Sequence, residues 1–93
     1  MKNMDDKQII GQLCSEGRLE EALAKVEKMI ATAPGDDSLW YESGRINWRL
    51  GRRAAAITAY NHAIALNPAS PAAEALAMVN SIMDFYNPDL LNP

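Results

Sequence analysis

A run of aromatic and basic residues in the middle of the chain has the composition of a ligand-binding surface. Helical steps of three or four residues connect Tyr41, Arg45, Trp48, Arg49 and Arg52 as neighbours on one face. A guanidinium can pair with a carboxylate through two parallel hydrogen bonds, and tryptophan and tyrosine bury large apolar areas. Such a face suits a protein segment with acidic and apolar groups. In the alternative interpretation, Trp48 packs against a neighbouring helix and the arginines form a solvated face.

The other reactive residue types form no catalytic or metal-binding pattern. His62, the single histidine, has no carboxylate or cysteine at metal-ligand spacing, so we expect it at the surface. Cys14 has no histidine on its own element, which favours a small packed residue over a reactive thiol. Capping of helix starts explains the carboxylate pairs Asp5-Asp6, Glu20-Glu21 and Asp36-Asp37 better than acid–base chemistry. We therefore expect no enzyme, no metal and no cofactor.

Composition restricts the classes of partner and compartment. The chain has 93 residues, 48% of them hydrophobic and 23% charged, which suits one small globular domain. Its net charge of -3 argues against nucleic acid. The acidic start lacks the apolar run of a signal peptide, and no stretch approaches the length of a membrane span. We therefore expect no membrane partner. A single cysteine cannot form an internal disulfide, so the expected location is the cytoplasm.

Turn and cap residues divide the chain into five expected helices. Gly17 and Gly51 suit the positive φ of C-terminal caps, and Ser70 followed by Pro71 suits a helix start. Pro34-Gly35 ends the second helix, and Asp36 or Asp37 caps the third. The expected helices cover about residues 5–16, 19–33, 37–50, 53–66 and 71–86.

The central stretch, residues 37–70, resembles a tetratricopeptide repeat. The pattern W-x2-L-G-x2-Y…A-x3-F…P of that family is matched in type and spacing by Trp40, Gly44, Ala56, Tyr60 and Pro68. Small residues in such a repeat let two helices cross closely while aromatic rings fill the remaining space.

Two residues of the central stretch depart from this pattern. Ser43 stands where the pattern has leucine, and Asn47 stands where it has tyrosine. Both are smaller and more polar than the pattern residues, so we expect them to thin the packing without removing the repeat.

A weaker copy of the pattern lies about 34 residues upstream. Gly17, Ala22 and Pro34 occupy the places of the central repeat's turn glycine, first alanine and closing proline, whereas Asp6 replaces the tryptophan. The resemblance therefore implies an all-α, right-handed α-α superhelix of five helices in one domain, 1–93. Its expected parts are a degenerate first repeat (3–36), a second repeat (37–70), a C-terminal capping helix (71–86) and a tail (87–93).

The resemblance also implies a non-enzymatic adaptor or scaffold that binds a peptide of a partner protein. In the family, the first helix of each repeat lines a concave groove, which would place the aromatic and basic face there together with Lys7 of the first helix. Some members hold the C-terminal carboxylate of heat-shock chaperones with a clamp of Lys, Asn, Asn, Lys and Arg. The corresponding positions here are Lys7, Gly11, Glu42, Ala72 and Leu76, and since only the first fits, we exclude that clamp.

An alternative function is self-association, as a homodimer or larger assembly, through the fifth helix and the tail. The fifth helix is apolar on one face, and Met78 and Phe85 lie outside that face. The tail adds Leu90 and Leu91, which could cover the fifth helix as a cap. With Asp89 beside these leucines, the tail could instead imitate an acidic and apolar ligand in the groove.

Overall fold

The fold consists of helices stacked in sequence order. The structure, a computed structural model, describes residues 4–85, with side chains for residues 4–81. This part contains five helices and no strand: α1 (Asp6–Ser15), α2 (Leu19–Thr32), α3 (Asp37–Arg49), α4 (Arg53–Leu66) and α5 (Ala72–Phe85). The all-α class is confirmed, and the helix bounds agree closely with those expected. None of these helices is long and apolar enough to cross a membrane.

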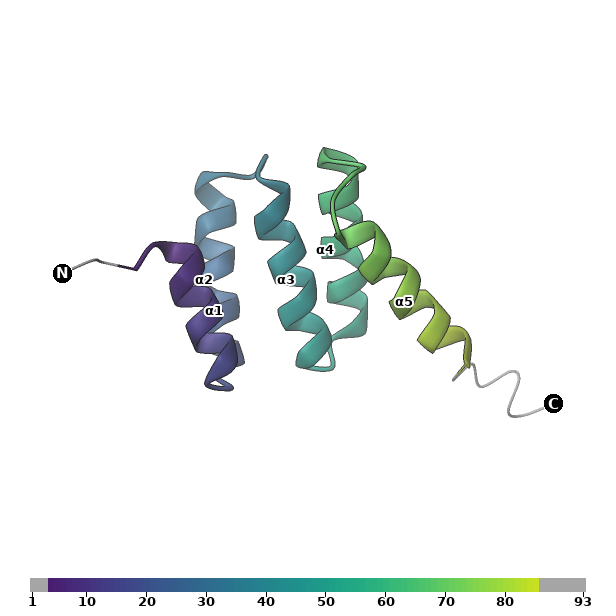
Figure 1. Cartoon of the computed structure of the whole chain (residues 1–93), viewed down its shortest axis with the longest axis horizontal. Coiled ribbons are helices and arrows are strands. Elements are labelled where there is room, and N and C mark those ends of the chain that lie inside the picture. Colours follow the sequence, from purple (N-terminus) through teal and green to yellow (C-terminus); the bar gives the residue numbers. More distant parts are fainter. Residues whose placement is uncertain (1–3, 86–93) are drawn as a thin grey trace.

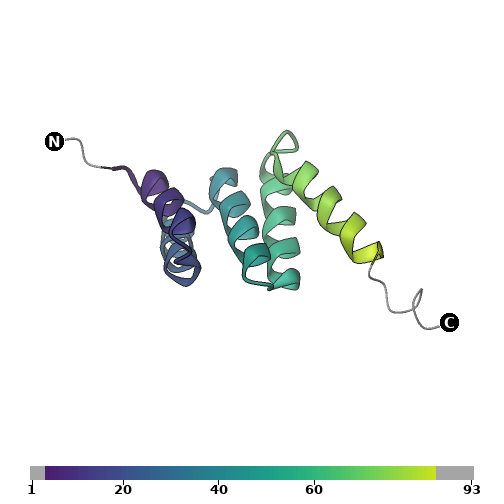
Figure 2. The same ribbon diagram turned by 60° about the horizontal axis from the view of Figure 1, so that its bottom comes forward.

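Each helix packs mainly against the next one along the chain, and the contact between α3 and α4 is the most extensive. Figure 1 shows α1 crossing in front of α2, with α4 behind α3 and α5. The second view again places α3 between α2 and α4 (Figure 2). The helix α3 is therefore the central element, bordered by neighbours on both sides.

Side chains cap the starts of α1 and α3, whereas α2 and α4 have no side-chain cap. Asp5 and Gln8 form a capping box at α1, in which the Gln8 backbone N–H donates to Asp5 Oδ1 at 2.8 Å. Of the two candidate caps of α3, Asp36 is used, because its Oδ1 accepts from the Ser38 backbone N–H at 3.0 Å. Both bonds satisfy backbone donors that have no partner within the helix.

Glycine closes α1 and α3 in the same way. Gly17 has φ 78° and Gly51 has φ 80°, a left-handed conformation that strains other residues. After each glycine the chain bonds back into the helix: Arg18 N–H donates to Leu13 O, and Arg52 N–H donates to Asn47 O, both at 2.9 Å. These are the backbone bonds of the Schellman motif. They turn the chain tightly enough for α2 and α4 to fold back as predicted.

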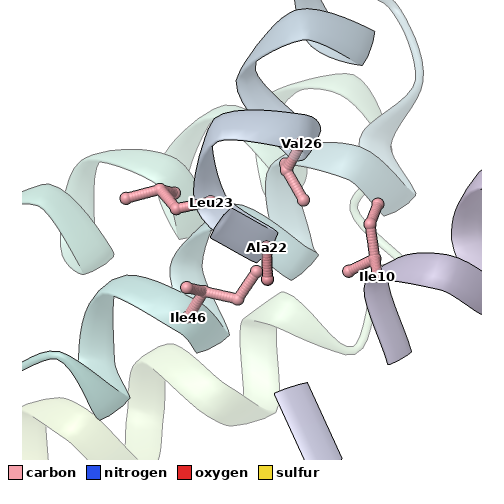
Figure 3. Packing of buried hydrophobic residues seen from close by; sticks show 5 residues of the cluster. All are labelled: Ile10, Ala22, Leu23, Val26 and Ile46. Carbon is pink, nitrogen blue, oxygen red and sulfur yellow. The ribbon is translucent and has the colours of Figure 1, made fainter. Parts of the chain in front are cut away.

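The first core cluster joins α1, α2 and α3. It consists of the buried residues Ile10, Ala22, Leu23, Val26 and Ile46. Figure 3 shows Ile10 on one side of α2 and the Leu23 side chain leaving that helix on the other side. The helix α2 therefore buries apolar residues toward both of its neighbours, which anchors the first helix pair to α3.

The second core cluster joins α4 and α5. Its buried members are Ala56, Tyr60, Ala63, Ala72 and Val79. The Tyr60 ring lies against α3 at a glycine: a Cβ at Gly44 would fall 2.5 Å from Tyr60 Cδ1. The absence of a side chain at this position is therefore what allows α3 and α4 to approach so closely.

Candidate functional site

A cleft of about 340 Å³ lies between α3 and α5. We call it the concave cleft; its lining residues are Tyr41, Arg45, Trp48, Arg49, Tyr60, Pro71, Glu74, Ala75 and Met78. Four of the six residues predicted from the sequence to bind a peptide are thus brought together here. The contribution of Tyr60 and the α5 residues was not evident from the sequence, because only the packing of α5 onto α4 places them next to α3.

Aromatic rings form the floor of the concave cleft. The Tyr41 and Tyr60 rings have centroids 6.1 Å apart and planes tilted by 39°, a favourable aromatic arrangement. The Arg45 guanidinium carbon lies 5.7 Å from the Tyr41 ring centroid, within range of a cation–π contact. Burial raises the pKa of the Tyr60 hydroxyl, which keeps that group protonated.

The indole of Trp48 has two surroundings at once. It is half-buried and packs against the second core cluster, and it also lines the concave cleft. The Arg53 guanidinium carbon is 5.9 Å from its ring centroid. Both interpretations made from the sequence therefore describe part of its position: Trp48 packs against its neighbours and still presents surface to the cleft.

The two arginines of the concave cleft differ in their partners. Arg45 forms an ion pair of 3.2 Å with Glu42 on the preceding turn of α3. Arg49 instead donates to the Cys14 backbone carbonyl at 3.3 Å and has no carboxylate within 4.0 Å among the described residues. With Glu74 also on the rim, the cleft is less basic than α3 alone suggests. Arg49 is the cation in the best position to meet an incoming carboxylate.

The other two predicted cations lie elsewhere. Lys7 donates to Ser38 Oγ at 2.7 Å and pairs with Asp36 at 3.4 Å, so it ties α1 to the start of α3. Arg52 pairs with Glu20 at the start of α2 and lines a separate cleft. The Lys7–Ser38 and Arg52–Glu20 contacts link residues 31 and 32 positions apart in the chain, which helical spacing within one element does not reveal.

The half-buried Cys14 has the surroundings of a packed residue. Burial raises the pKa of its thiol, Glu42 raises it further, and Arg49 and Arg45 oppose this effect. A raised pKa leaves little thiolate at neutral pH, and the thiolate is the reactive form. The geometry therefore favours the structural interpretation of this cysteine.

The exposed His62 has a partner that its sequence neighbours do not indicate. Its ring stacks on Trp40, with centroids 4.2 Å apart and planes 16° apart. The Trp40 Nε1–H donates to the Pro34 carbonyl at 2.9 Å, which fixes the indole at the top of α3. Within the described residues, no group of three or more histidine, cysteine, aspartate or glutamate side chains is arranged to hold a metal ion.

The residues predicted for self-association are only partly described. Met78 on α5 is 66% exposed and lines the concave cleft. The Phe85 side chain, Leu90 and Leu91 lie outside the described part of the chain.

A family model for the tetratricopeptide repeat matches residues 13–80 of the chain. The chain belongs to the tetratricopeptide repeat family. This chain is also similar to a solved structure, the solution NMR structure of protein BF1650 from Bacteroides fragilis. The two are 40% identical, with a TM-score of 0.83 over 96% of this chain and 91% of the other. Among curated proteins, none matches.

These findings confirm the family and the fold expected from the sequence. Tetratricopeptide repeats are generally protein-interaction modules, and they are typically not enzymes. The concave cleft lies between α3 and α5, the first helices of two consecutive units.

Proposed function

We propose that this tetratricopeptide protein binds an acidic and apolar peptide segment of a partner protein in the concave cleft. The observation that carries this proposal is Arg49: a guanidinium beside the apolar cleft, with no carboxylate partner among the described residues. Charge-assisted bonds from a guanidinium to a carboxylate are stronger than neutral ones.

The remaining surface of the concave cleft suits an apolar side chain. Trp48, Ala75 and Met78 line it from two helices, and the cleft surface is mostly apolar. A leucine or phenylalanine of the peptide would bury its side chain there, while an acidic neighbour would meet Arg49. Arg45 would contribute less, because Glu42 already neutralises part of its charge.

Fluorescence anisotropy with labelled peptides tests the proposal. A peptide of alternating leucine and aspartate should bind, and the same peptide with lysine in place of aspartate should not. Arg49→Glu should weaken binding at least tenfold, because it replaces an attraction by a repulsion. Lys28→Glu, at an exposed position of α2 and with the same change in charge, should bind as the parent does. Equal affinities of the two variants would contradict the proposal.

Self-association is the second candidate function, and the exposure of Met78 favours it. A thioether that is 66% exposed on the last described helix offers an apolar contact to a second copy of the chain. Sedimentation at increasing protein concentration should then show a dimer that Met78→Lys dissociates. A chain that stays monomeric at millimolar concentration excludes this function.

A further inference from the structure

A second and larger cleft lies between α2 and α4, with α3 as its floor. Its volume is about 690 Å³, within the range of ligand sites. We call it the outer cleft. At its floor are Ser43 and Asn47, the two residues that depart from the family pattern. Where the pattern places a leucine and a tyrosine, this chain has two small polar residues and a hollow.

The polar floor of the outer cleft is buried but not fully bonded. Ser43 and Asn47 are 7% and 6% exposed. Asn47 Nδ2 donates to the Ser43 carbonyl at 2.9 Å and to Ser43 Oγ at 3.3 Å, whereas its Oδ1 accepts no hydrogen bond from the described residues. Among the described residues, no fully buried side-chain nitrogen or oxygen lacks a partner, so Asn47 Oδ1 keeps some exposed surface, and Asn47 lines the outer cleft. The floor thus presents an acceptor and a hydroxyl to an occupant.

The walls of the outer cleft allow close approach of a backbone. Ala54, Ala55 and Ala59 line the α4 side, and alanine lets helices pack at short distance. Trp40 and Asn47 lie seven positions apart on α3, a rise of about 10 Å, which is about two turns of a parallel helix. The outer cleft is bordered by α2 and α4, and an amphipathic helix binds other proteins in a groove between helices of this kind.

The charge at the edge of the outer cleft selects a basic occupant. Glu27 on α2 lines the cleft, is exposed, and forms no ion pair with a described residue. Arg52, at the other end, is already paired with Glu20 and so repels a cation less. A lysine or arginine on the occupant would meet Glu27.

We propose that the outer cleft binds an α-helix of a partner protein that places an asparagine or glutamine against Asn47 and Ser43 and a basic residue against Glu27. A carboxamide can donate to Asn47 Oδ1 and accept from the Ser43 hydroxyl. This site is separate from the concave cleft, and it takes a partner of the opposite charge.

The test uses the full chain and a capped, alanine-based helical peptide of about 18 residues, a length at which isolated helices begin to be stable. The peptide carries one central glutamine and a lysine one turn away. In NMR titrations, the Asn47 side-chain amide and the Trp40 indole should shift, while the Trp48 indole in the concave cleft should not. Exchange of the glutamine for leucine, or of the lysine for glutamate, should weaken binding. Shifts confined to Trp48, or no shifts at millimolar peptide, would overturn the proposal.

Free N-acetylglutamine amide separates a helix from a small carboxamide ligand. It should shift the Asn47 amide far less than the peptide does at equal concentration. Equal shifts would overturn the assignment of a helical occupant.

Two variants test the cleft from the side of this chain. The double variant Ser43→Leu, Asn47→Tyr restores the pattern residues. It should fill the hollow and raise the melting temperature, and it should lower the affinity for the helical peptide more than tenfold. Glu27→Lys leaves the floor intact and should weaken binding of the lysine peptide about threefold, as expected for an exposed ion pair. Glu74→Lys makes the same change of charge in the concave cleft. It should leave the affinity for the lysine-containing helical peptide unchanged. Full affinity of the peptide for both outer-cleft variants would overturn the proposal.

Discussion

The concave cleft and the outer cleft lie on two sides of α3 and differ in chemistry. The concave cleft presents guanidinium groups and aromatic rings. The outer cleft presents alanines, an amide, a hydroxyl and a carboxylate. A single helix of thirteen residues provides part of both surfaces. The packing of α4 against α3 keeps the two faces apart, so the two proposed partners do not compete for the same surface.

The strongest way to break both clefts is to disturb the contact that separates them. Gly44→Ala would place a Cβ against the Tyr60 ring, and overpacking of this kind typically costs about 1–3 kcal/mol. We expect the free energy of unfolding to fall by about 2 kcal/mol in urea denaturation, even though alanine is the better helix former.

Gly11→Ala is the matched control for this change. Gly11 lies in α1, and a Cβ added there meets no atom within 4 Å. The same substitution should therefore raise the free energy of unfolding by about 0.5–1 kcal/mol. A Gly44→Ala variant as stable as Gly11→Ala would show that the close approach of α3 and α4 does not depend on this glycine.

Trp48→Leu should affect the concave cleft alone. Leucine keeps part of the apolar contact to α5 but removes the indole and its contact with Arg53. The affinity for the acidic peptide should fall about tenfold, or roughly 1.4 kcal/mol. The basic helical peptide should bind as it does to the parent chain. A parallel loss for both peptides, with the fold intact by circular dichroism, would mean that the clefts are coupled.

Asp36 tests the support of α3, which both clefts share. Its bond to the Ser38 hydroxyl, with further bonds to the Ser38 backbone and Lys7, holds its pKa below the usual range. Because the folded pKa is depressed, the stabilisation is full above the unfolded value of about 3.9 and is lost as the pH falls through the folded value. Asp36→Ala should therefore cost about 1 kcal/mol at neutral pH and much less in acid.

Asp36→Asn provides the control for the charge. Asparagine caps helices as well as aspartate does, so most of the neutral-pH stability should remain while the titration disappears. Urea denaturation at several pH values measures both effects. A cost of Asp36→Ala that does not change between neutral and acid pH would contradict the ionic part of the argument.

The smallest expected effect concerns the edge of the outer cleft. His62→Ala removes the ring stacked on Trp40 and should cost about 0.5–1 kcal/mol. The Trp40 indole resonance should shift while that of Trp48 stays in place. A shift of both, or of neither, would show that this stack does not set the position of Trp40.

The sequence could predict the helices because their ends depend on local signals. Gly17, Gly51 and Asp36 act through neighbours a few residues away, so their types are sufficient to place the caps. Most of the aromatic and basic face was also predictable, since Tyr41, Arg45, Trp48 and Arg49 belong to one helix and helical spacing brings them together.

The remaining features depend on contacts between helices. Lys7 and Arg52 form ion pairs with carboxylates of other elements, and neither residue lines the concave cleft. The stack of His62 on Trp40 joins α4 to α3 at no fixed spacing. The two departures, Ser43 and Asn47, were visible as small polar residues, but their position on the floor of a cleft follows only from how α2 and α4 flank α3.

The position of α5 has a consequence for how the concave cleft opens. This helix packs mainly on α4, so it can detach without disturbing the first core cluster. Local opening at that end would expose its amides to hydrogen exchange while those of α2 and α3 stay protected. A peptide in the concave cleft would contact both α3 and α5, and would therefore hold α5 in its packed position. Binding of the peptide would then slow hydrogen exchange of the α5 amides, although α5 provides only one wall of the site.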